Sequence, residues 1–204
     1  MELSSGHPEI WAHMPGGPFA SVDNFRSEFI NGFCAPVGVF SYAILDLTKS
    51  SQEGSEEDAF AGMISYMNSS PINLCTEIGA VVVLPLFQRT HVASNAVGLM
   101  IHHAFRSEAE GGLGLTRVVW QTSSANKGSA KVAERMGFKH EGTLKYDRRF
   151  KQGKLHSKVG NGRPLPPGSD ENDLWRDTLV FGLCWDDWER GAREKVQAAM
   201  DRTK

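Results

Sequence analysis

Residues 120–142 read WQTSSANKGSAKVAERMGFKHEG, and this stretch predicts a strand, a short helix and a second strand in close succession. Residues 116–122 are rich in Thr, Val and Trp, which is the composition of a strand. A polar loop follows, and residues 129–136 read as a short helix. Gly137 stands where a helix commonly ends in a left-handed cap. Residues 138–150 then predict the next strand.

Three further strands are predicted upstream, at residues 40–46, 59–67 and 76–84. Turn residues follow two of them, so the three strands are expected to form a meander. Residues 92–106 are apolar nearly all round the helical wheel, which predicts a buried helix. Residues 21–32 have the capped, amphipathic pattern of another helix.

The downstream part begins with residues 153–173, which are rich in Gly, Pro and Lys and too long for a tight turn. We predict a mobile loop there. A last strand is expected at residues 178–185 and a terminal helix at residues 190–204. The order helix, meander, helix, strand, helix, strand, strand predicts a mixed α/β (α+β) layer fold. A length of 204 residues fits a single domain, residues 1–204.

The composition is that of an ordinary globular protein. There are 22 Lys and Arg against 24 Asp and Glu, a net charge of −2, which argues against a surface that wraps nucleic acid. No stretch approaches the ~20 apolar residues that a membrane span needs, and the first residues show no secretory signal. The three cysteines have no metal-ligand spacing and cannot pair evenly. They predict free thiols in a reducing, cytoplasmic compartment.

Four groups of residues that carry chemistry lie in one order along the chain. They are EIG at 77–79, QRTHVA at 88–93, the pattern W-x5-N-x2-S-x7-G-F-x2-E-G at 120–142, and WRDT at 175–178. Over roughly residues 11–188 the chain resembles the GNAT superfamily of acyl-CoA N-acyltransferases. The resemblance is to the ribosomal-protein acetyltransferase branch typified by RimJ and RimL, and within it to fungal and bacterial members of unknown substrate. The pattern at 120–142 is the most specific of the four.

The resemblance implies a central twisted mixed sheet, flanked by helices, that splays at its centre to admit acyl-CoA. The opening would lie between the strand at residues 77–84 and the strand at 117–122. Family members usually begin with a strand upstream of the Trp11 region, and this chain has little room for one. We therefore expect either a sheet without its first strand or a homodimer in which another subunit covers the bare edge.

The stretch at residues 88–93 stops a strand and begins a helix. Backbone N–H groups at such a place are unpaired, and with the helix dipole they form a ready site for a pyrophosphate. By itself the stretch also reads as an ordinary strand-to-helix turn. His91 replaces the first glycine of the family pattern Q/R-x-x-G-x-G/A, so its backbone must avoid left-handed angles or bear a small strain. The resemblance implies that strand and loop residues together bind acetyl-CoA: Val81, Val82, Val83, Gln88, Arg89, Thr90, His91, Val92 and Ala93.

Asn126 and Ser129 flank the start of the short helix. Their side-chain oxygens suit a capping role. The resemblance implies a cofactor-binding role as well, with Asn126 on the pantetheine arm and Ser129 facing the thioester sulfur. The two readings are compatible, because a cap residue already points at the cofactor side. The hydroxyl of Ser129 would then help to protonate the leaving thiolate.

Glu77 is the candidate general base. Amide formation needs a neutral amine, and deprotonating a lysine-like amine at neutral pH costs roughly 4–5 kcal/mol, whereas an α-amine costs only about 1. A carboxylate on the central strand, acting through water, would take that proton as the amine attacks the thioester. The alternative is a solvent-facing residue before an apolar run.

Other clusters are less specific. His91, His102 and His103 do not have metal-ligand spacing, so we expect no metal site. Seven basic residues, with only Asp147 between them, suit either a solvated hairpin and loop or a patch that attracts an acidic acceptor. They are Lys145, Arg148, Arg149, Lys151, Lys154, Lys158 and Arg163.

The leading hypothesis is transfer of an acetyl group from acetyl-CoA to a primary amine, by direct attack in a ternary complex. The acceptor would be a small molecule or a protein amine, with neither a membrane nor nucleic acid as partner. The alternative hypothesis is a CoA-binding module without catalysis that acts as a sensor or assembly partner. Release of free thiol from acetyl-CoA over a panel of amines distinguishes the two.

Overall fold

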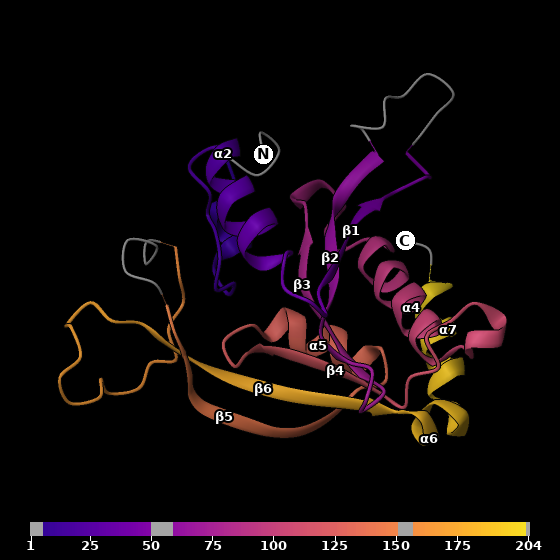
Figure 1. Cartoon of the computed structure of the whole chain (residues 1–204). Helices are drawn as coiled ribbons and strands as arrows, with labels where there is room; N and C mark the ends of the chain where they lie inside the picture. Colours follow the sequence, from indigo (N-terminus) through magenta and orange to yellow (C-terminus); the bar gives the residue numbers. More distant parts are fainter. Residues whose placement is uncertain (1–5, 50–58, 151–156, 203–204) are drawn as a thin grey trace.

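The computed structural model describes residues 6–49, 59–150 and 157–202, and within them six strands form one mixed sheet. Figure 1 shows this sheet twisting through the molecule, with helices packed against it. Its strand order is β1-β2-β3-β4-β6-β5, and only β3 and β4 run parallel. The strands are β1 (Phe40–Leu45), β2 (Phe60–Ser70), β3 (Cys75–Val83), β4 (Arg117–Ser123), β5 (Lys139–Arg149) and β6 (Trp175–Cys184).

The parallel pair separates after a short contact. Only Cys75, Thr76 and Glu77 of β3 pair with β4. Just beyond, the register with β2 shifts by one extra residue on β3, and Ala80 takes a left-handed φ of 49°. A bulge of this kind bends the strand that carries it. The bend turns the rest of β3 away from β4, so the predicted splay at the centre of the sheet is confirmed.

Two helices cover one side of the sheet. Helix α4 (Val92–Phe105) contacts β2, β3 and β4, and it packs against α7 (Arg193–Met200), beside which it lies in Figure 1. The two helices approach closely because α4 has Gly98 at the contact, where a Cβ would meet the sulfur of Met200 at 2.3 Å. This face of α4 is buried as predicted, whereas Leu99 on the opposite face is 62% exposed.

The remaining helices frame the ends of the sheet. Helix α5 (Lys127–Arg135) packs on β4 and β5, and α2 (Val22–Phe25) continues into η2 (Arg26–Phe33). Short turns of helix complete the chain: η1 (Pro8–Trp11), η3 (Pro85–Phe87), η4 (Glu108–Glu110), α6 (Trp185–Asp187) and η5 (Trp188–Ala192). Among the side chains that are buried deepest in the core are Ile78 of β3, Ile101 of α4, Val118 of β4, and Phe181 and Leu183 of β6.

The predicted elements lie close to the observed ones. Gly137 has the left-handed φ of 88° expected of its cap. The last strand begins at Trp175, three residues earlier than predicted, and α7 begins at Arg193 because Gly191, with φ 115°, breaks the preceding turn. Among the described residues no strand precedes β1, which lies at the edge of the sheet.

The segment that precedes β6 forms no helix or strand over residues 157–173, and residues 153–156 of the predicted loop lie outside the described part. Lys158 is buried in this segment. Its ammonium donates to the carbonyl oxygens of Trp11, Met14 and Gly16 at 2.7–2.8 Å. The segment is thereby joined to the N-terminal region. Its mobility stays a prediction.

Candidate active site

A pocket of about 650 Å³ opens where β3 and β4 part. Most of its walls come from four parts of the chain: the end of β3, the loop that leads into α4, the end of β4 with the start of α5, and the N-terminal region near His13. β5 and β6 each contribute an arginine. Residues from most of the chain length therefore meet in one cavity, which is open enough to receive a ligand.

The loop from Gln88 to His91 is a tight turn with one left-handed residue. That residue is Arg89, with φ 62°, whereas His91 has an ordinary helical φ of −65°. The sequence left two alternatives for His91, a backbone that avoids left-handed angles or one that bears a small strain. The first of these is observed. The hydroxyl of Thr90 donates to the carbonyl of Phe87 at 2.6 Å and accepts from the N–H of Val92 at 3.3 Å, which closes the turn.

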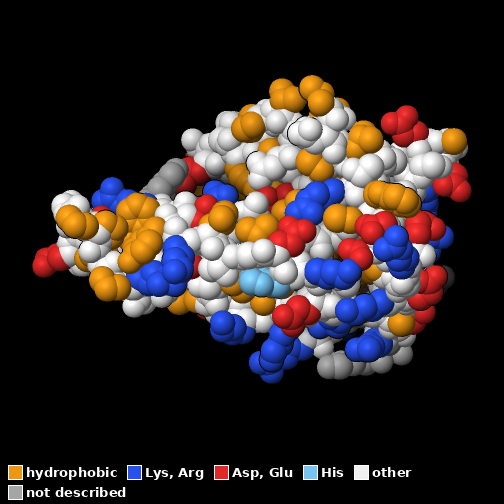
Figure 2. Space-filling view, turned by 90° about the horizontal axis from the view of Figure 1, so that it is seen from below, with side chains coloured by type: hydrophobic (Ala, Val, Ile, Leu, Met, Phe, Trp, Pro, Cys, Tyr) orange, Lys and Arg blue, Asp and Glu red, His pale blue; other side chains and the backbone are white. Residues whose placement is uncertain are grey.

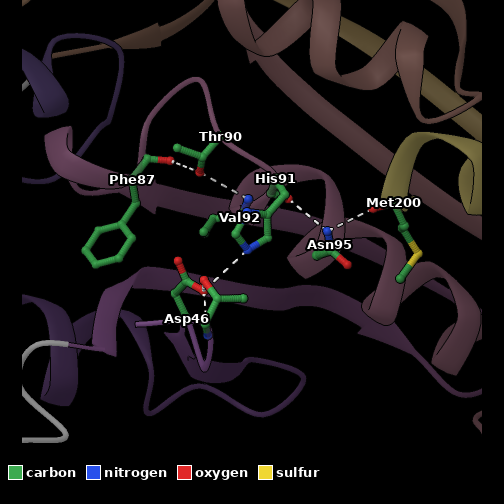
Figure 3. Close-up of polar contacts among 8 residues, drawn as sticks. Asp46, Phe87, Thr90, His91, Val92, Asn95 and Met200 are labelled. Atoms are coloured by element: carbon green, nitrogen blue, oxygen red, sulfur yellow. Dashed lines mark hydrogen bonds and ion pairs between the residues drawn. The ribbon is translucent and has the colours of Figure 1, made fainter. Parts of the chain in front are cut away.

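His91 also fastens this loop to β1 (Figure 3). Its Nε2 lies 3.3 Å from Oδ1 of buried Asp46, just after β1, and Asn95 donates to the carbonyls of both His91 and Met200. Burial raises the pKa of the Asp46 carboxyl, but hydrogen bonds from Thr48 and the nearby His91 outweigh it and hold that pKa below its usual value. The start of α4 is thus fixed from two sides.

The start of α4 leaves hydrogen-bond donors open. In the described part of the chain, the backbone N–H groups of Arg89, Thr90, His91, Ala93 and Ser94 find no protein acceptor. These five residues line the pocket, and the positive end of the α4 dipole lies beside them. Unpaired N–H groups at a helix N-terminus suit a phosphate.

Three arginines add positive charge to the pocket: Arg89 in this loop, Arg135 at the end of α5 and Arg202 after α7. The Nε of Arg135 is buried and, within the described residues, has no hydrogen-bond partner. An anionic ligand would satisfy it. The open N–H groups and these cations together fit the phosphates of CoA.

Of the remaining strand and loop residues that were predicted to bind acetyl-CoA, four line the pocket and one does not. Val81, Val82, Val83 and Gln88 line the pocket, and the valines lie beyond the point where β4 stops pairing with β3. Val92 does not line it, because its side chain is 3% exposed and packs in the core. Gln88 donates from Nε2 to the carbonyl of Val83, which ties the loop back to the strand.

Asn126 and Ser129 lie together on the pocket wall. Oδ1 of Asn126 accepts from the N–H of Ser129 at 3.0 Å, so Asn126 caps α5 as its type suggests. The Ser129 hydroxyl accepts from Nε1 of Trp120 at 3.0 Å. Because that bond uses a lone pair of the oxygen, the hydroxyl proton stays available for donation.

Glu77 is the last residue of β3 that pairs with β4, and it faces the pocket. It is 6% exposed, so the solvent-facing alternative is wrong for this side chain. Its Oε2 accepts from Nδ2 of Asn68 at 2.8 Å. Burial raises the pKa of this carboxyl, although Asn68, Arg148 and Arg176 oppose the shift. A carboxyl of raised pKa in a pocket is a candidate base.

The basic residues between Lys145 and Arg163 are partly neutralised by aspartates that lie downstream in the sequence. Arg149 pairs with Asp173 at 2.7 Å, and Arg163 pairs with Asp177. Figure 2 shows Lys and Arg side chains mixed with Asp and Glu on the face seen from below. Lys158 is buried, while Lys151 and Lys154 lie outside the described residues. These pairs favour the reading of a solvated hairpin and loop over a patch that is uniformly basic.

Several residues that line the pocket were not assigned a role from sequence. His13, Arg135 and Arg202 stand in no motif that would have identified them. Arg176 belongs to the WRDT stretch, and Arg148 belongs to the basic run, so a signal existed for both. Sequence reasoning could not place them beside Glu77, because a bulge in β5 near Tyr146 sets which of its side chains face inward.

The histidines on α4 have separate neighbours. His102 contacts the ring of Trp188 and His103 that of Tyr66. In the described residues, the group with ligand atoms close enough for a metal is Cys184, Asp186 and Asp187. This group does not line the pocket, and its two carboxylates pair with Arg190 and Lys139.

Residues 4–139 match the family model described as "Acetyltransferase (GNAT) domain", which is more than half of the chain. The chain belongs to the GNAT acetyltransferase family. Its fold and the opening between β3 and β4 agree with that membership. GNAT proteins use acetyl-CoA, so an acyltransferase activity follows from the family. No helix in the described part of this GNAT chain is long and apolar enough to cross a membrane.

Solved GNAT structures resemble this one over most of its length. A probable acetyltransferase from Chromobacterium violaceum has 27% identity and a TM-score of 0.69, over 92% of this chain and 81% of its own. A GCN5-related N-acetyltransferase from Brucella melitensis has 22% identity and a TM-score of 0.71, over 98% and 75%. Spermidine N-acetyltransferase from Vibrio cholerae, solved with CoA and spermine, has 14% identity and a TM-score of 0.59, over 90% and 86%. No curated protein matches the chain significantly.

Proposed function

We propose that this GNAT protein transfers an acetyl group from acetyl-CoA to a primary amine by direct attack in a ternary complex. The observation that carries the proposal is the meeting of three features in one pocket: the open N–H groups before α4, the buried carboxylate of Glu77 and the hydroxyl of Ser129. A site that only bound CoA would have no use for a carboxyl of raised pKa beside it.

In this mechanism the phosphates of CoA lie on the open N–H groups of the loop, with Arg89, Arg135 and Arg202 around them. The pantetheine arm follows the free edge of Val81–Val83, and Asn126 lies on the opposite side. The acyl group is thereby brought between the parted strands, next to Ser129. Such positioning supplies much of the rate enhancement in a two-substrate reaction.

Glu77 receives the proton of the amine, through water, and the nitrogen lone pair then attacks the thioester carbonyl carbon. The C–S bond breaks as the amide forms. Ser129 donates its hydroxyl proton to the thiolate and regains a proton, through solvent, from the nitrogen, which loses its second proton to become the amide. Glu77 suits this role because burial raises the pKa of its carboxyl toward that of an effective base at neutral pH. The nearby positive charges of Arg148 and Arg176 oppose this rise and favour the ionised carboxylate.

The proposal includes the RimJ/RimL-like branch and a single domain over residues 1–204. It places the protein in the reducing cytoplasm, where the three free cysteines would stay reduced. A homodimer through the edge strand β1 is the corresponding prediction for assembly, because Phe40, Tyr42 and Leu45 are exposed there. Sedimentation would measure it.

The test is release of free thiol from acetyl-CoA over a panel of amines, with the acetylated product identified by mass. A calorimetric titration with CoA runs beside it. Turnover of at least one amine, lost in Glu77→Gln, supports the proposal. CoA binding without turnover of any amine would contradict it.

A further inference from the structure

The charged residues of the pocket are unevenly divided. Among the described residues that line it, Glu77 is the one carboxylate, against five arginines. Arg89, Arg135 and Arg202 are near the start of α4 and the neighbouring α5 and α7, where phosphates would bind. The other two arginines, Arg148 on β5 and Arg176 on β6, lie close enough to Glu77 to lower the pKa of its carboxyl. CoA phosphates at the α4 end do not account for this second pair.

The two arginines differ in their partners. Arg148 has a carboxylate beside it, since its Nε lies 3.3 Å from Oδ2 of Asp147. Arg176 has none. Within the described chain, no carboxylate oxygen lies within 4.0 Å of its guanidinium nitrogens, the distance that defines an ion pair. Its side chain nevertheless is 6% exposed. Arg176 is therefore a buried cation without a direct ion pair, and the carboxylates of Asp147 and Glu77 act on it only from beyond that distance.

Hydrogen bonds on the Nε side of the guanidinium fix the orientation of Arg176. Its Nε donates to the hydroxyl of Thr178 at 3.0 Å, and that hydroxyl donates to Oδ2 of Asp147 at 2.6 Å. In the described residues its two terminal NH2 groups have no protein acceptor. An arginine held by Nε, with both NH2 groups free at a pocket wall, presents the planar fork that binds a carboxylate through two parallel hydrogen bonds.

His13, which lies near Arg176, also suits an anionic ligand. Nδ1 of His13 is buried without a hydrogen-bond partner in the described residues, and His13 lines the pocket. Burial lowers the pKa of its imidazole, and Arg176 and Lys158 lower it further. The imidazole is thus neutral at pH 7. A neutral ring beside Arg176 adds a hydrogen bond without adding charge that would repel or neutralise an anion.

Burial of the charged Arg176 side chain has an electrostatic cost, which appears in its pKa. Burial lowers its pKa to about 10, and nearby Arg148 contributes, although Asp147 and Glu77 act in the opposite direction. The guanidinium is still charged at neutral pH. An unpaired buried charge is unfavourable, and a ligand that carries the opposite charge relieves it on binding.

We propose that the acceptor is an amine that carries a carboxylate a few bonds away, as α- and β-amino acids do. The carboxylate lies on the guanidinium of Arg176, and the amine is directed toward Glu77. This inference rests on the proposed acetyl transfer and names its substrate class. A polyamine would instead bring a second cation toward Arg176 and Arg148. Both arginines lie beyond residue 139, where the family match ends.

The experiment compares each acceptor with its own uncharged derivative. A panel of α- and β-amino acids is assayed with acetyl-CoA, each beside its carboxamide, with spermidine as the polyamine. The amine of the carboxamide loses its proton more easily, so amine chemistry alone would favour the amide. We expect at least one acid to exceed its amide by tenfold or more in kcat/KM, and spermidine to be a poor acceptor.

Three variants assign the preference to Arg176. Arg176→Met should bring the acid-to-amide ratio to one or below while CoA binding stays unchanged, and Arg176→Lys, which retains the charge, should restore part of the ratio. Thr178→Val removes the group that orients the guanidinium, and should raise KM for the acid more than it lowers kcat. Arg190→Met, on an exposed arginine outside the pocket, is the matched control and should leave the ratio unaltered.

The two proposals fail in different ways. Amides or spermidine that react as well as the acids, with a ratio that Arg176→Met does not change, would overturn the substrate class and leave acetyl transfer standing. No turnover of any amine would overturn acetyl transfer. Calorimetry of the acids on the CoA-bound protein then decides the remaining question. Binding that Arg176→Met abolishes supports the carboxylate site, and absence of binding overturns it.

Discussion

Glu77 combines two properties at the scale of a single residue: it is buried and it lines the pocket. Glu77→Gln keeps the size of the side chain but cannot accept a proton. We expect kcat to fall by ~10²–10⁴ at neutral pH. Raising the pH toward the pKa of the amine should restore part of the rate, because solvent then supplies the neutral amine. A pH–rate profile that runs parallel to that of the parent protein would place the base elsewhere.

The same residue predicts a stability effect of known sign. The pKa of Glu77 is raised on folding. The contribution of this group to the free energy of unfolding is therefore favourable at acid pH and is lost as the pH rises through the raised pKa. Glu77→Gln should therefore melt above the parent protein at about pH 8 and close to it at about pH 4. Glu194→Gln, on an exposed residue of α7, is the control and should show no such crossover. Thermal unfolding across this range measures both.

Ser129 should behave differently from Glu77 because it acts on the leaving group. Ser129→Ala removes the hydroxyl proton and leaves Nε1 of Trp120 without its acceptor. We expect a smaller loss of rate than for Glu77→Gln, without rescue at high pH. The loss should shrink with a thioester whose thiol is more acidic, since such a thiolate needs no proton to leave. Equal losses across thioesters of different thiol pKa would rule out the acid role.

At the scale of the element, the start of α4 is the feature that binds phosphate in our proposal. Ala93→Asp places a carboxylate beside the open N–H groups and should weaken CoA binding at least tenfold, or about 1.4 kcal/mol. The fold should tolerate it, because an acidic residue in the first turn of a helix is favourable. Ala198→Asp adds the same charge at an exposed position of α7. An unchanged Kd in Ala93→Asp would show that the phosphates bind elsewhere.

Arg89, in the same loop, has a strained backbone and carries a positive charge, and the two properties can be tested separately. A left-handed φ costs a non-glycine residue roughly 1–2 kcal/mol, and glycine almost nothing. Arg89→Gly and Arg89→Ala both remove the charge, so both should weaken CoA binding. Arg89→Gly should however be the more stable of the two by about 1 kcal/mol. Chemical denaturation beside a CoA titration separates the two effects. Equal stabilities would mean that the loop relaxes around residue 89.

At the scale of the whole molecule, residues 153–173, between β5 and β6 in the sequence, are the segment that we predict to be mobile. Within them, Lys158 reaches three carbonyl groups of the N-terminal region, and the N–H of Val159 donates to the carbonyl of Ala12. We predict that limited proteolysis cuts this segment first in the free protein, and more slowly with CoA and acceptor present. Lys158→Met should speed the cleavage. Full resistance of the free protein would contradict the prediction.

The sequence by itself determined the local elements and the family. The alternation of apolar residues in the strands, the cap at Asn126 and the stop at Gly137 depend on neighbours in the chain, so pattern and propensity suffice to predict them. The pattern at residues 120–142 likewise predicted the fold and the type of site, because its residues both build α5 and face the pocket.

Only the tertiary structure decided which distant groups meet. Arg149, at the end of β5, pairs with Asp173, just before β6, and Arg163, in the segment between the two strands, pairs with Asp177 of β6. Burial and ion pairing depend on the packing of segments far apart in sequence, which no local pattern encodes. For the same reason the position of Arg176, buried beside Glu77 without a carboxylate of its own, emerged from the structure alone.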